Sequence, residues 1–166
     1  MPIEFEVKLN QKDMYRFHMH HIYTGIHGAM SIVFALLTFV MAGYMYSRGQ
    51  SNYTLIYAVL GIVFLIYFPL DSKFKSAVQI AAPNGLKDGI RYQFTDEKIK
   101  VSVGEESVEL TWDQIYKMQS TKTLILIYTS RKHAYILTRE AVGEHYEALY
   151  QMAGRCLEKY QNCMKA

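Results

Sequence analysis

Residues 25–46 read GIHGAMSIVFALLTFVMAGYMY, and residues 53–70 read YTLIYAVLGIVFLIYFPL. Arg48 is the only Asp, Glu, Lys or Arg between residues 17 and 70. A helix rises about 1.5 Å per residue, so about 20 apolar residues cross a hydrocarbon layer about 30 Å thick. Both segments come close to that length, and the polar connector Ser47–Asn52 is too short to recross a bilayer. The sequence therefore predicts a transmembrane helical hairpin over residues 25–70.

Two core helices of a soluble protein are the alternative to this hairpin. A soluble helix of such length needs a polar face, whereas Ile32–Met41 has none and Leu60–Leu70 is apolar on all sides. A Lys at mid-span would cost about 2.5–3.5 kcal/mol on insertion scales, and neither segment contains one. The first segment also begins too far from Met1 for a removable signal peptide. The pattern favours two retained spans.

Lysine and arginine side chains flank the two spans unequally. The connector holds Arg48 alone, whereas the flanking chain holds Lys8, Lys12, Arg16, Lys73, Lys75 and Lys87. By the positive-inside rule, we expect two spans in the cell inner (plasma) membrane with both termini in the cytoplasm. The net charge of +3 is small, so we expect no nucleic-acid partner.

The remaining chain is water-facing and alternates short elements. Ile3–Leu9 alternates apolar and charged residues, which predicts a strand within residues 1–10 that needs a sheet to join. We expect an amphipathic juxtamembrane helix over 13–24. After the second span we expect a linker over 71–84, which consists of a short separate helix over 71–81 and a turn where Pro83-Asn84-Gly85 stops that helix. Six strand candidates follow at close spacing, typical of an antiparallel meander or small barrel, over 90–94, 98–103, 108–112, 115–120, 124–129 and 134–138.

A C-terminal helix follows the strands. Apolar residues recur at spacings of three and four from Thr138 to Tyr160, and we expect this helix to carry both Cys156 and Cys163 as reduced thiols. The first strand can join the six later ones, because the hairpin returns the chain to the same side of the membrane. The predicted fold is membrane α+β: a two-helix hairpin inserted after the first strand of a seven-stranded antiparallel sheet or barrel with a C-terminal helix.

A chain with this order resembles the YcxB-like family of small bacterial membrane proteins. The resemblance implies that residues 85–166 form a cytoplasmic pleckstrin-homology-like domain, and it brings no catalytic residues. Where the family commonly has Pro after its Tyr-Ile-Leu strand, this chain has Thr138. We therefore expect Thr138 to cap the start of the following helix in place of the proline. The matching residues are Phe5–Leu9, Asp13, Phe17, the two spans, Tyr92–Glu97, Leu110–Ile115 and Ala134–Leu137.

Three groups of side chains are candidates for contact with the membrane or a metal. Aromatic rings at span ends settle among lipid headgroups, so we expect a membrane-interface set of Tyr23, Tyr44, Tyr46, Arg48, Tyr53 and Tyr67. Small residues at which another helix could approach are the pair Gly25 and Ala29 and the series Gly28, Ala35, Ala42 and Gly43. A third group consists of His18, His20, His21 and His27. These histidines could bind a metal, could make pH-sensitive contacts with lipid headgroups, or could simply lie at the membrane interface.

The histidines lack carboxylate or cysteine neighbours at ligand spacing, so we expect no metal, no cofactor and no catalytic residue. The leading hypothesis is a non-enzymatic, membrane-anchored interaction or regulatory protein whose partner is another membrane protein or a second copy. An anionic-lipid-recognising module is the alternative, and a membrane-surface enzyme is a third. Membrane lipids would be contacted by Lys98, Lys100, Lys117, Lys122, Arg131 and Lys132.

Overall fold

The chain divides into two units that are described separately below. The computed structural model describes residues 2–82, 89–131 and 133–165. The helical unit is Met14–Gln79, and the β domain combines Met1–Asp13 with Ile80–Ala166. The protein is α+β: two long apolar helices near the N-terminus, two sheets and a C-terminal helix.

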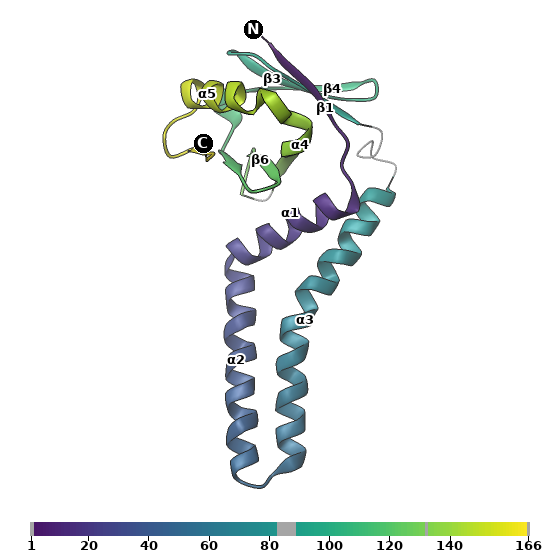
Figure 1. Ribbon diagram of the computed structural model, residues 1–166, viewed down its shortest axis with the longest axis vertical. Helices are drawn as coiled ribbons and strands as arrows, with labels where there is room; N and C mark the ends of the chain where they lie inside the picture. Colours follow the sequence, from purple (N-terminus) through teal and green to yellow (C-terminus); the bar gives the residue numbers. More distant parts are fainter. Residues whose placement is uncertain (1, 83–88, 132, 166) are drawn as a thin grey trace. The chain divides into compact units, whose positions relative to one another are not determined.

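The helical unit is built around a hairpin of two long helices that lie side by side (Figure 1). The chain reverses direction between them at Gly49, whose φ of 70° is strained for residues with a side chain. A third helix precedes the hairpin and ends at Thr24, and it covers the residues 13–24 over which a helix was expected. Its position beside a membrane stays a prediction. The helices are α1 (Gln11–Thr24), α2 (Ile26–Ser47) and α3 (Ser51–Ala81).

The helix α3 is longer than the sequence suggested. We expected the second span to end at Leu70 and a separate linker helix to follow, but α3 runs without interruption through Pro69 to Ala81. An ion pair of 2.7 Å between Lys75 Nζ and Asp71 Oδ2, four residues apart, supports the turns after the proline. The expected stop at residues 83–85 lies outside the described residues.

The first sheet joins the N-terminal strand to strands that follow the hairpin. Its order is β1-β2-β3-β4, and all neighbours are antiparallel. Phe5 lies opposite Tyr92, so the expected return of the first strand to the later ones is confirmed. The four strands are β1 (Ile3–Val7), β2 (Ile90–Phe94), β3 (Lys98–Val103) and β4 (Glu106–Thr111).

A second sheet replaces the single seven-stranded sheet that we expected. The chain leaves β4 through the short 3₁₀ helix η1 (Trp112–Gln114), after which the strands pair only with one another in the order β7-β6-β5-β8. The prediction was wrong because this break in the extended chain starts a new sheet, and because the last strand was read as helix. The strands are β5 (Lys117–Ser120), β6 (Leu124–Tyr128), β7 (Ala134–Thr138) and β8 (Asn162–Cys163).

The C-terminal helix is shorter and more broken than expected. Thr138 caps its start, accepting a hydrogen bond from the Ala141 N–H at 3.3 Å, as predicted. Gly143, with φ of 46°, breaks the helix, and Leu157 is extended, so Cys163 lies in β8, parallel to β5, and not on the helix. The helical pieces are α4 (Arg139–Val142), the 3₁₀ turn η2 (Gly143–His145) and α5 (Tyr146–Cys156).

The core of the β domain lies between its two sheets. All five residues of β6 are buried, and Leu137 and Leu149 are fully buried around them. Tyr92 of β2 donates a hydrogen bond from its hydroxyl to the Ile136 carbonyl of β7 at 3.4 Å, which joins the sheets, and burial raises the pKa of this phenol. Stability of the β domain therefore depends on β6 and its neighbours.

We predict that Leu126→Ala lowers the free energy of unfolding by about 2–5 kcal/mol, because it leaves a cavity in a fully buried strand. Unfolding is measured in denaturant through the fluorescence of Trp112, the only tryptophan, which is buried. Tyr160→Ala is the control, because Tyr160 is 77% exposed and its loss should change stability by no more than about 0.5 kcal/mol. Equal effects of the two substitutions would contradict this account of the core.

Candidate functional site: an apolar helical hairpin

The outward surface of α2 and α3 is apolar along both helices. By length and composition, Gly28–Ser47 and Ser51–Ala81 are each able to cross a membrane. Only 17% and 6% of their most apolar windows are buried, unlike the core helices of a soluble protein. The most exposed of their aliphatic side chains include Leu36, Leu37, Val40, Leu55, Ile56 and Leu70.

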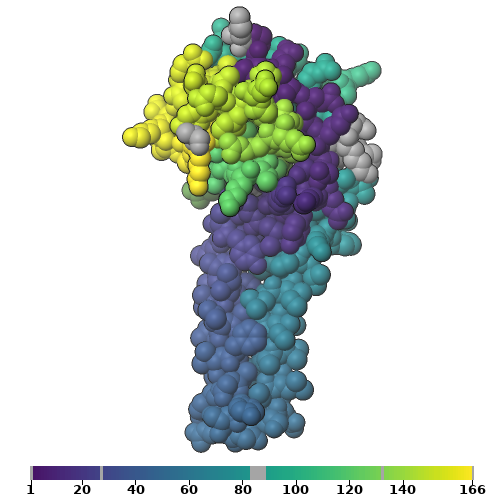
Figure 2. Space-filling view, in the orientation of Figure 1, coloured from purple at the N-terminus to yellow at the C-terminus, as the bar shows by residue number. Residues whose placement is uncertain are grey.

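The inner surface of the hairpin is formed by small residues. Ser31 donates a hydrogen bond from its hydroxyl to the Phe64 carbonyl at 2.7 Å, which ties α2 to α3. A Cβ atom on Gly61 would lie 2.9 Å from the Phe39 ring and from Thr38 Oγ1, so the helices approach closely there. Figure 2 shows the side chains of the two helices meeting along the hairpin. The helix that approaches α2 is therefore α3 of the same chain.

The small residues predicted on α2 for approach of another helix do not all face α3. Ala35 and Ala42 are buried, and Gly28 lies against the end of α1, where a Cβ would be 2.6 Å from the Ile22 carbonyl oxygen. Gly43 is exposed, with no atom within 4 Å of a Cβ placed on it. Three of the four residues in the series therefore pack against other residues of the same chain, and Gly43 faces outward.

An apolar groove of about 360 Å³ opens between α2 and α3. Phe34 and Phe64 stack across it with ring centroids 5.8 Å apart. The hydroxyl of Ser31 is already bonded to Phe64, so the groove presents hydrocarbon and aromatic surface. Its walls are Met30, Ser31, Phe34, Val63, Phe64, Tyr67 and Phe68.

The predicted membrane-interface residues fall at the two ends of the hairpin. Arg48 donates from Nη2 to the Tyr44 hydroxyl at 2.9 Å, and its guanidinium lies 5.3 Å from the centre of that ring. Tyr46 and Tyr53 flank the same turn and are mostly exposed. Tyr67 lies about 21 Å further along α3 than Tyr53, at about 1.5 Å per residue, and Tyr23 lies in the last turn of α1. Headgroup contact by this set stays a prediction.

The histidines of α1 lie beside aromatic and amide groups. His18 Nε2 is 2.8 Å from Gln79 Oε1, and the Phe17 ring stacks on His21 with centroids 6.0 Å apart. The side chain of His27 lies outside the described residues. Among the residues that the structure describes, no three His, Cys, Asp or Glu side chains are grouped so as to hold a metal ion. His18 is therefore hydrogen-bonded within the helical unit.

The predicted lipid-contacting cations are distributed over both sheets. Lys98 and Lys100 lie on β3, whereas Lys117 lies on β5 with its ammonium 5.7 Å from the Tyr128 ring centre. Lys122 follows β5, Arg131 follows β6, and Lys132 lies outside the described residues. The structure therefore does not gather the described cations on one strand pair.

The two lysines of β3 face carboxylates. Lys98 Nζ lies 2.8 Å from Glu109 Oε2, and this hydrogen bond, with a smaller contribution from Lys100, holds the pKa of the Glu109 carboxyl below its usual value. A row of cross-strand neighbours, Glu4, Gln93, Lys100 and Glu109, crosses the sheet. Cations and carboxylates thus alternate on this face, which weakens its attraction for an anionic surface.

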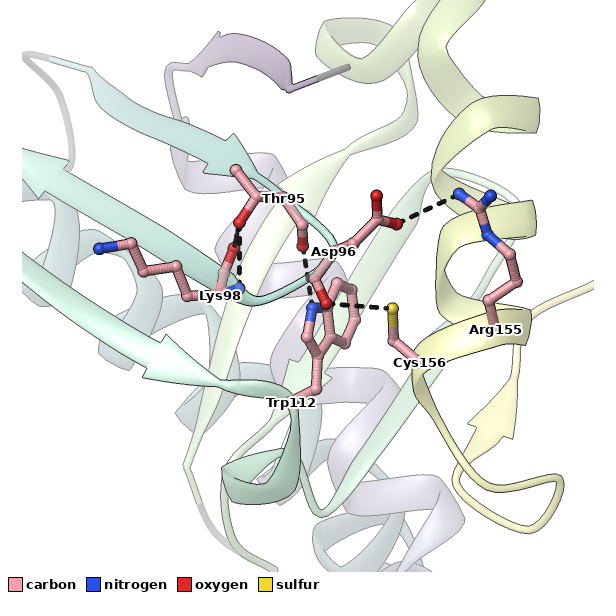
Figure 3. Close-up of polar contacts among 6 residues, drawn as sticks. All are labelled: Thr95, Asp96, Lys98, Trp112, Arg155 and Cys156. Atoms are coloured by element: carbon pink, nitrogen blue, oxygen red, sulfur yellow. Dashed lines mark hydrogen bonds and ion pairs between the residues drawn. The ribbon is translucent and has the colours of Figure 1, made fainter.

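A polar junction connects the β2–β3 turn, η1 and α5 (Figure 3). Trp112 donates from Nε1 to the Thr95 carbonyl at 2.9 Å, and Arg155 Nη2 lies 3.3 Å from Asp96 Oδ1. The Cys156 thiol donates to the Asp96 carbonyl at 3.6 Å. Sequence reasoning identified Thr95-Asp96-Glu97 only as a turn, and no local pattern links that turn to residues about 60 positions later.

Residues 94–153 match the family model of the YcxB-like protein. This match confirms the resemblance for the segment that starts at the last residue of β2 and ends within α5. The YcxB-like segment contains Thr95, Asp96 and Trp112 of the junction, whereas Arg155 and Cys156 follow it. Comparisons with curated proteins and with solved structures gave no match.

We predict that Gly61→Leu destabilises the full chain in detergent by about 1–3 kcal/mol, because the added side chain overpacks the contact with Phe39 and Thr38. Gly43→Leu is the matched control: it makes the same change in helix propensity, but its site is open. The measurement is the midpoint of thermal loss of helical circular dichroism. A Gly43→Leu variant that is equally destabilised would refute the close approach at Gly61.

The two thiols should differ in reactivity. Burial, followed by the charge of Asp96, raises the pKa of Cys156 above its ordinary value, while Arg155 opposes this. Because the thiolate is the reactive form, we expect iodoacetamide to alkylate Cys156 more slowly than exposed Cys163 near pH 8. Mass spectrometry over a pH series measures both rates. Asp96→Asn should lower the Cys156 pKa and leave Cys163 unchanged; equal rates in the parent chain would disprove the assignment.

Proposed function

We propose that this chain is a non-enzymatic, membrane-anchored interaction protein. In this proposal α2 and α3 cross the inner membrane as a hairpin, and the β domain adopts a pleckstrin-homology-like fold that is presented at the cytoplasmic face to a protein partner. The observation that carries the proposal is the apolar outer surface of the two helices, which are joined by a turn whose only charged side chain is Arg48.

The free energy of exposing that surface to water supports insertion. Each large apolar side chain moved out of water contributes about 1.5–3 kcal/mol, and the exposed set includes Leu36, Val40, Leu55 and Ile56. Leaving many such residues in water would cost tens of kcal/mol, more than the roughly 5–15 kcal/mol that stabilises a typical domain. A bilayer removes this cost, and both helices satisfy their own backbone hydrogen bonds there.

The arrangement of the β domain supports the finer part of the proposal. Two four-stranded sheets, the first antiparallel and the second largely so, with α5 after the first seven strands, are consistent with a pleckstrin-homology-like module. The YcxB-like match covers most of that module. Attachment to the membrane confines the module to a thin layer, where the raised effective concentration makes weak contacts sufficient.

Recognition of anionic lipid by the β domain has less support than contact with a protein. Lys98 is paired with Glu109, and Lys117 lies by the Tyr128 ring, so both cations already have partners. Lys100 has Glu109 as its cross-strand neighbour. We therefore place the function in protein contact.

Site-specific labelling of intact cells tests the topology. A membrane-impermeant maleimide should label Gln50→Cys in the turn of the hairpin from outside, whereas exposed Cys163 should react only after the membrane is opened. The full chain should also stay in the membrane pellet after alkaline carbonate treatment. Labelling of Cys163 in intact cells, or release of the chain by carbonate, would overturn the proposal.

A further inference from the structure

The strand β4 is exposed on both faces, unlike the other strands of the first sheet, each of which has buried residues. Each of its residues is exposed or half-buried, whereas all five residues of β6 are buried. Among the residues that the structure describes, β4 is an edge of its sheet and pairs only with β3. Figures 1 and 2 show the turned end of the β3–β4 hairpin projecting from the β domain. The outer side of β4 is therefore open to another strand.

The register identifies which backbone groups face outward. Lys98 uses its N–H and carbonyl to bond Thr95 on the β2 side, so its pair with Thr111 on β4 is not hydrogen-bonded. Antiparallel ladders alternate bonded and non-bonded pairs, so Glu106, Val108 and Leu110 bond β3. The N–H and carbonyl groups of Ser107 and Glu109 consequently point away from the sheet.

Edge strands of this kind are usually protected by charged side chains, especially lysine, or by proline, a bulge or short length. Glu109 of β4 is paired with Lys98 on the neighbouring strand, which leaves Glu106 as the other charge of β4. The six residues of β4, ESVELT, include neither lysine nor proline. Val108, on the same face as the buried Val101, is 49% exposed at the centre of the strand. A six-residue edge without lysine or proline, and with an exposed valine at its centre, is suited to pairing.

We propose that β4 pairs with β4 of a second copy of this chain, antiparallel about a two-fold axis at Val108. That the partner is a protein rests on the proposed function, whereas the contacting surface and the register are inferred from β4 itself. In this pairing Ser107 lies opposite Glu109 of the second copy, and each such pair exchanges two backbone hydrogen bonds. The two sheets then join into one continuous sheet.

Charge selects this register from the possible ones. The outward backbone N–H and carbonyl groups of one β4 must face those of the other. The two-fold axis of a symmetric pairing therefore lies at Ser107, Val108 or Glu109. An axis at Glu109 places Glu109 opposite Glu109 of the second copy, and an axis at Ser107 places Glu109 opposite Glu105. Both arrangements set two carboxylates directly across from each other, and such like-charge pairs destabilise a sheet. Centring on Val108 places Glu106 opposite Leu110 and brings the two Val108 side chains together. Self-complementarity of this kind favours a second copy over an unrelated strand.

Disulfide trapping in the full chain tests the pairing. The Cα atoms of a non-hydrogen-bonded pair are about 4.5 Å apart, within the range of a disulfide. Val108→Cys, in a chain with Cys156→Ser and Cys163→Ser, should form a disulfide-linked dimer in membranes on mild oxidation. The control retains native Cys163 and changes only Cys156→Ser, because Cys163 is exposed and reports random collision. We expect dimer to form at least about tenfold faster with Val108→Cys.

The register is tested by two further variants. Ser107→Cys alone should crosslink weakly, whereas Ser107→Cys combined with Glu109→Cys should crosslink strongly, because these positions oppose each other across the axis. Crosslinking of Val108→Cys no faster than the Cys163 control would overturn the pairing, and strong crosslinking of Ser107→Cys alone would overturn the register.

Proline at position 107 provides an independent measurement. Ser107→Pro removes an outward N–H and leaves the bonds to β3 intact, so we expect a monomer by light scattering in detergent, with unchanged Trp112 fluorescence. Ser107→Ala keeps the N–H and should remain dimeric. A Ser107→Pro chain that stays dimeric would contradict the proposal. If carbonate releases the chain while Val108→Cys still crosslinks, the membrane proposal fails and the pairing stands.

Discussion

Water cannot solvate the outer surface of α2 and α3 without a large free-energy cost, and this constraint accounts for the organisation of the chain. It explains why charge is absent from residues 17–47 and 49–70, and why the single cation between them, Arg48, lies at the turn. The inner side of the hairpin meets a different requirement. Close approach at Gly61 and the Ser31 hydrogen bond hold the two helices together. In the proposed membrane setting these contacts carry the association, because helices in lipid gain little from hydrophobic burial against each other.

The β domain is stabilised by ordinary burial and by links between its layers. Its core lies around β6, and the Tyr92 hydroxyl bonds across from one sheet to the other. The junction of Trp112 with Thr95, and of Arg155 with Asp96, anchors α5 beside the β2–β3 turn. The exposed Arg155–Asp96 ion pair contributes at most about 1 kcal/mol, so the buried indole and its hydrogen bond are the stronger link.

Much of the fold could be predicted from periodicity. The bounds of β2, β3 and β7 match the expected strands, and the hairpin and the return of β1 were recognised from apolar length and alternation. Three features escaped because their causes are not local. The helix α3 continues through Pro69, the strands separate into two sheets after Trp112, and β8 forms only through pairing with the distant β5. The Asp96–Arg155 junction was missed for the same reason.

The pairing of β1 with β2 has a consequence for how the protein is made. Val7 and Ile90 are partners, yet the whole helical hairpin is synthesised between them. At about 5–20 residues per second, a ribosome needs roughly 4–17 s to reach β2 after finishing β1. During that interval the first strand has no sheet to enter, while both apolar helices emerge from the ribosome. Assembly of the β domain therefore follows synthesis of the hairpin, and in the proposed topology it also follows insertion of the hairpin into the membrane.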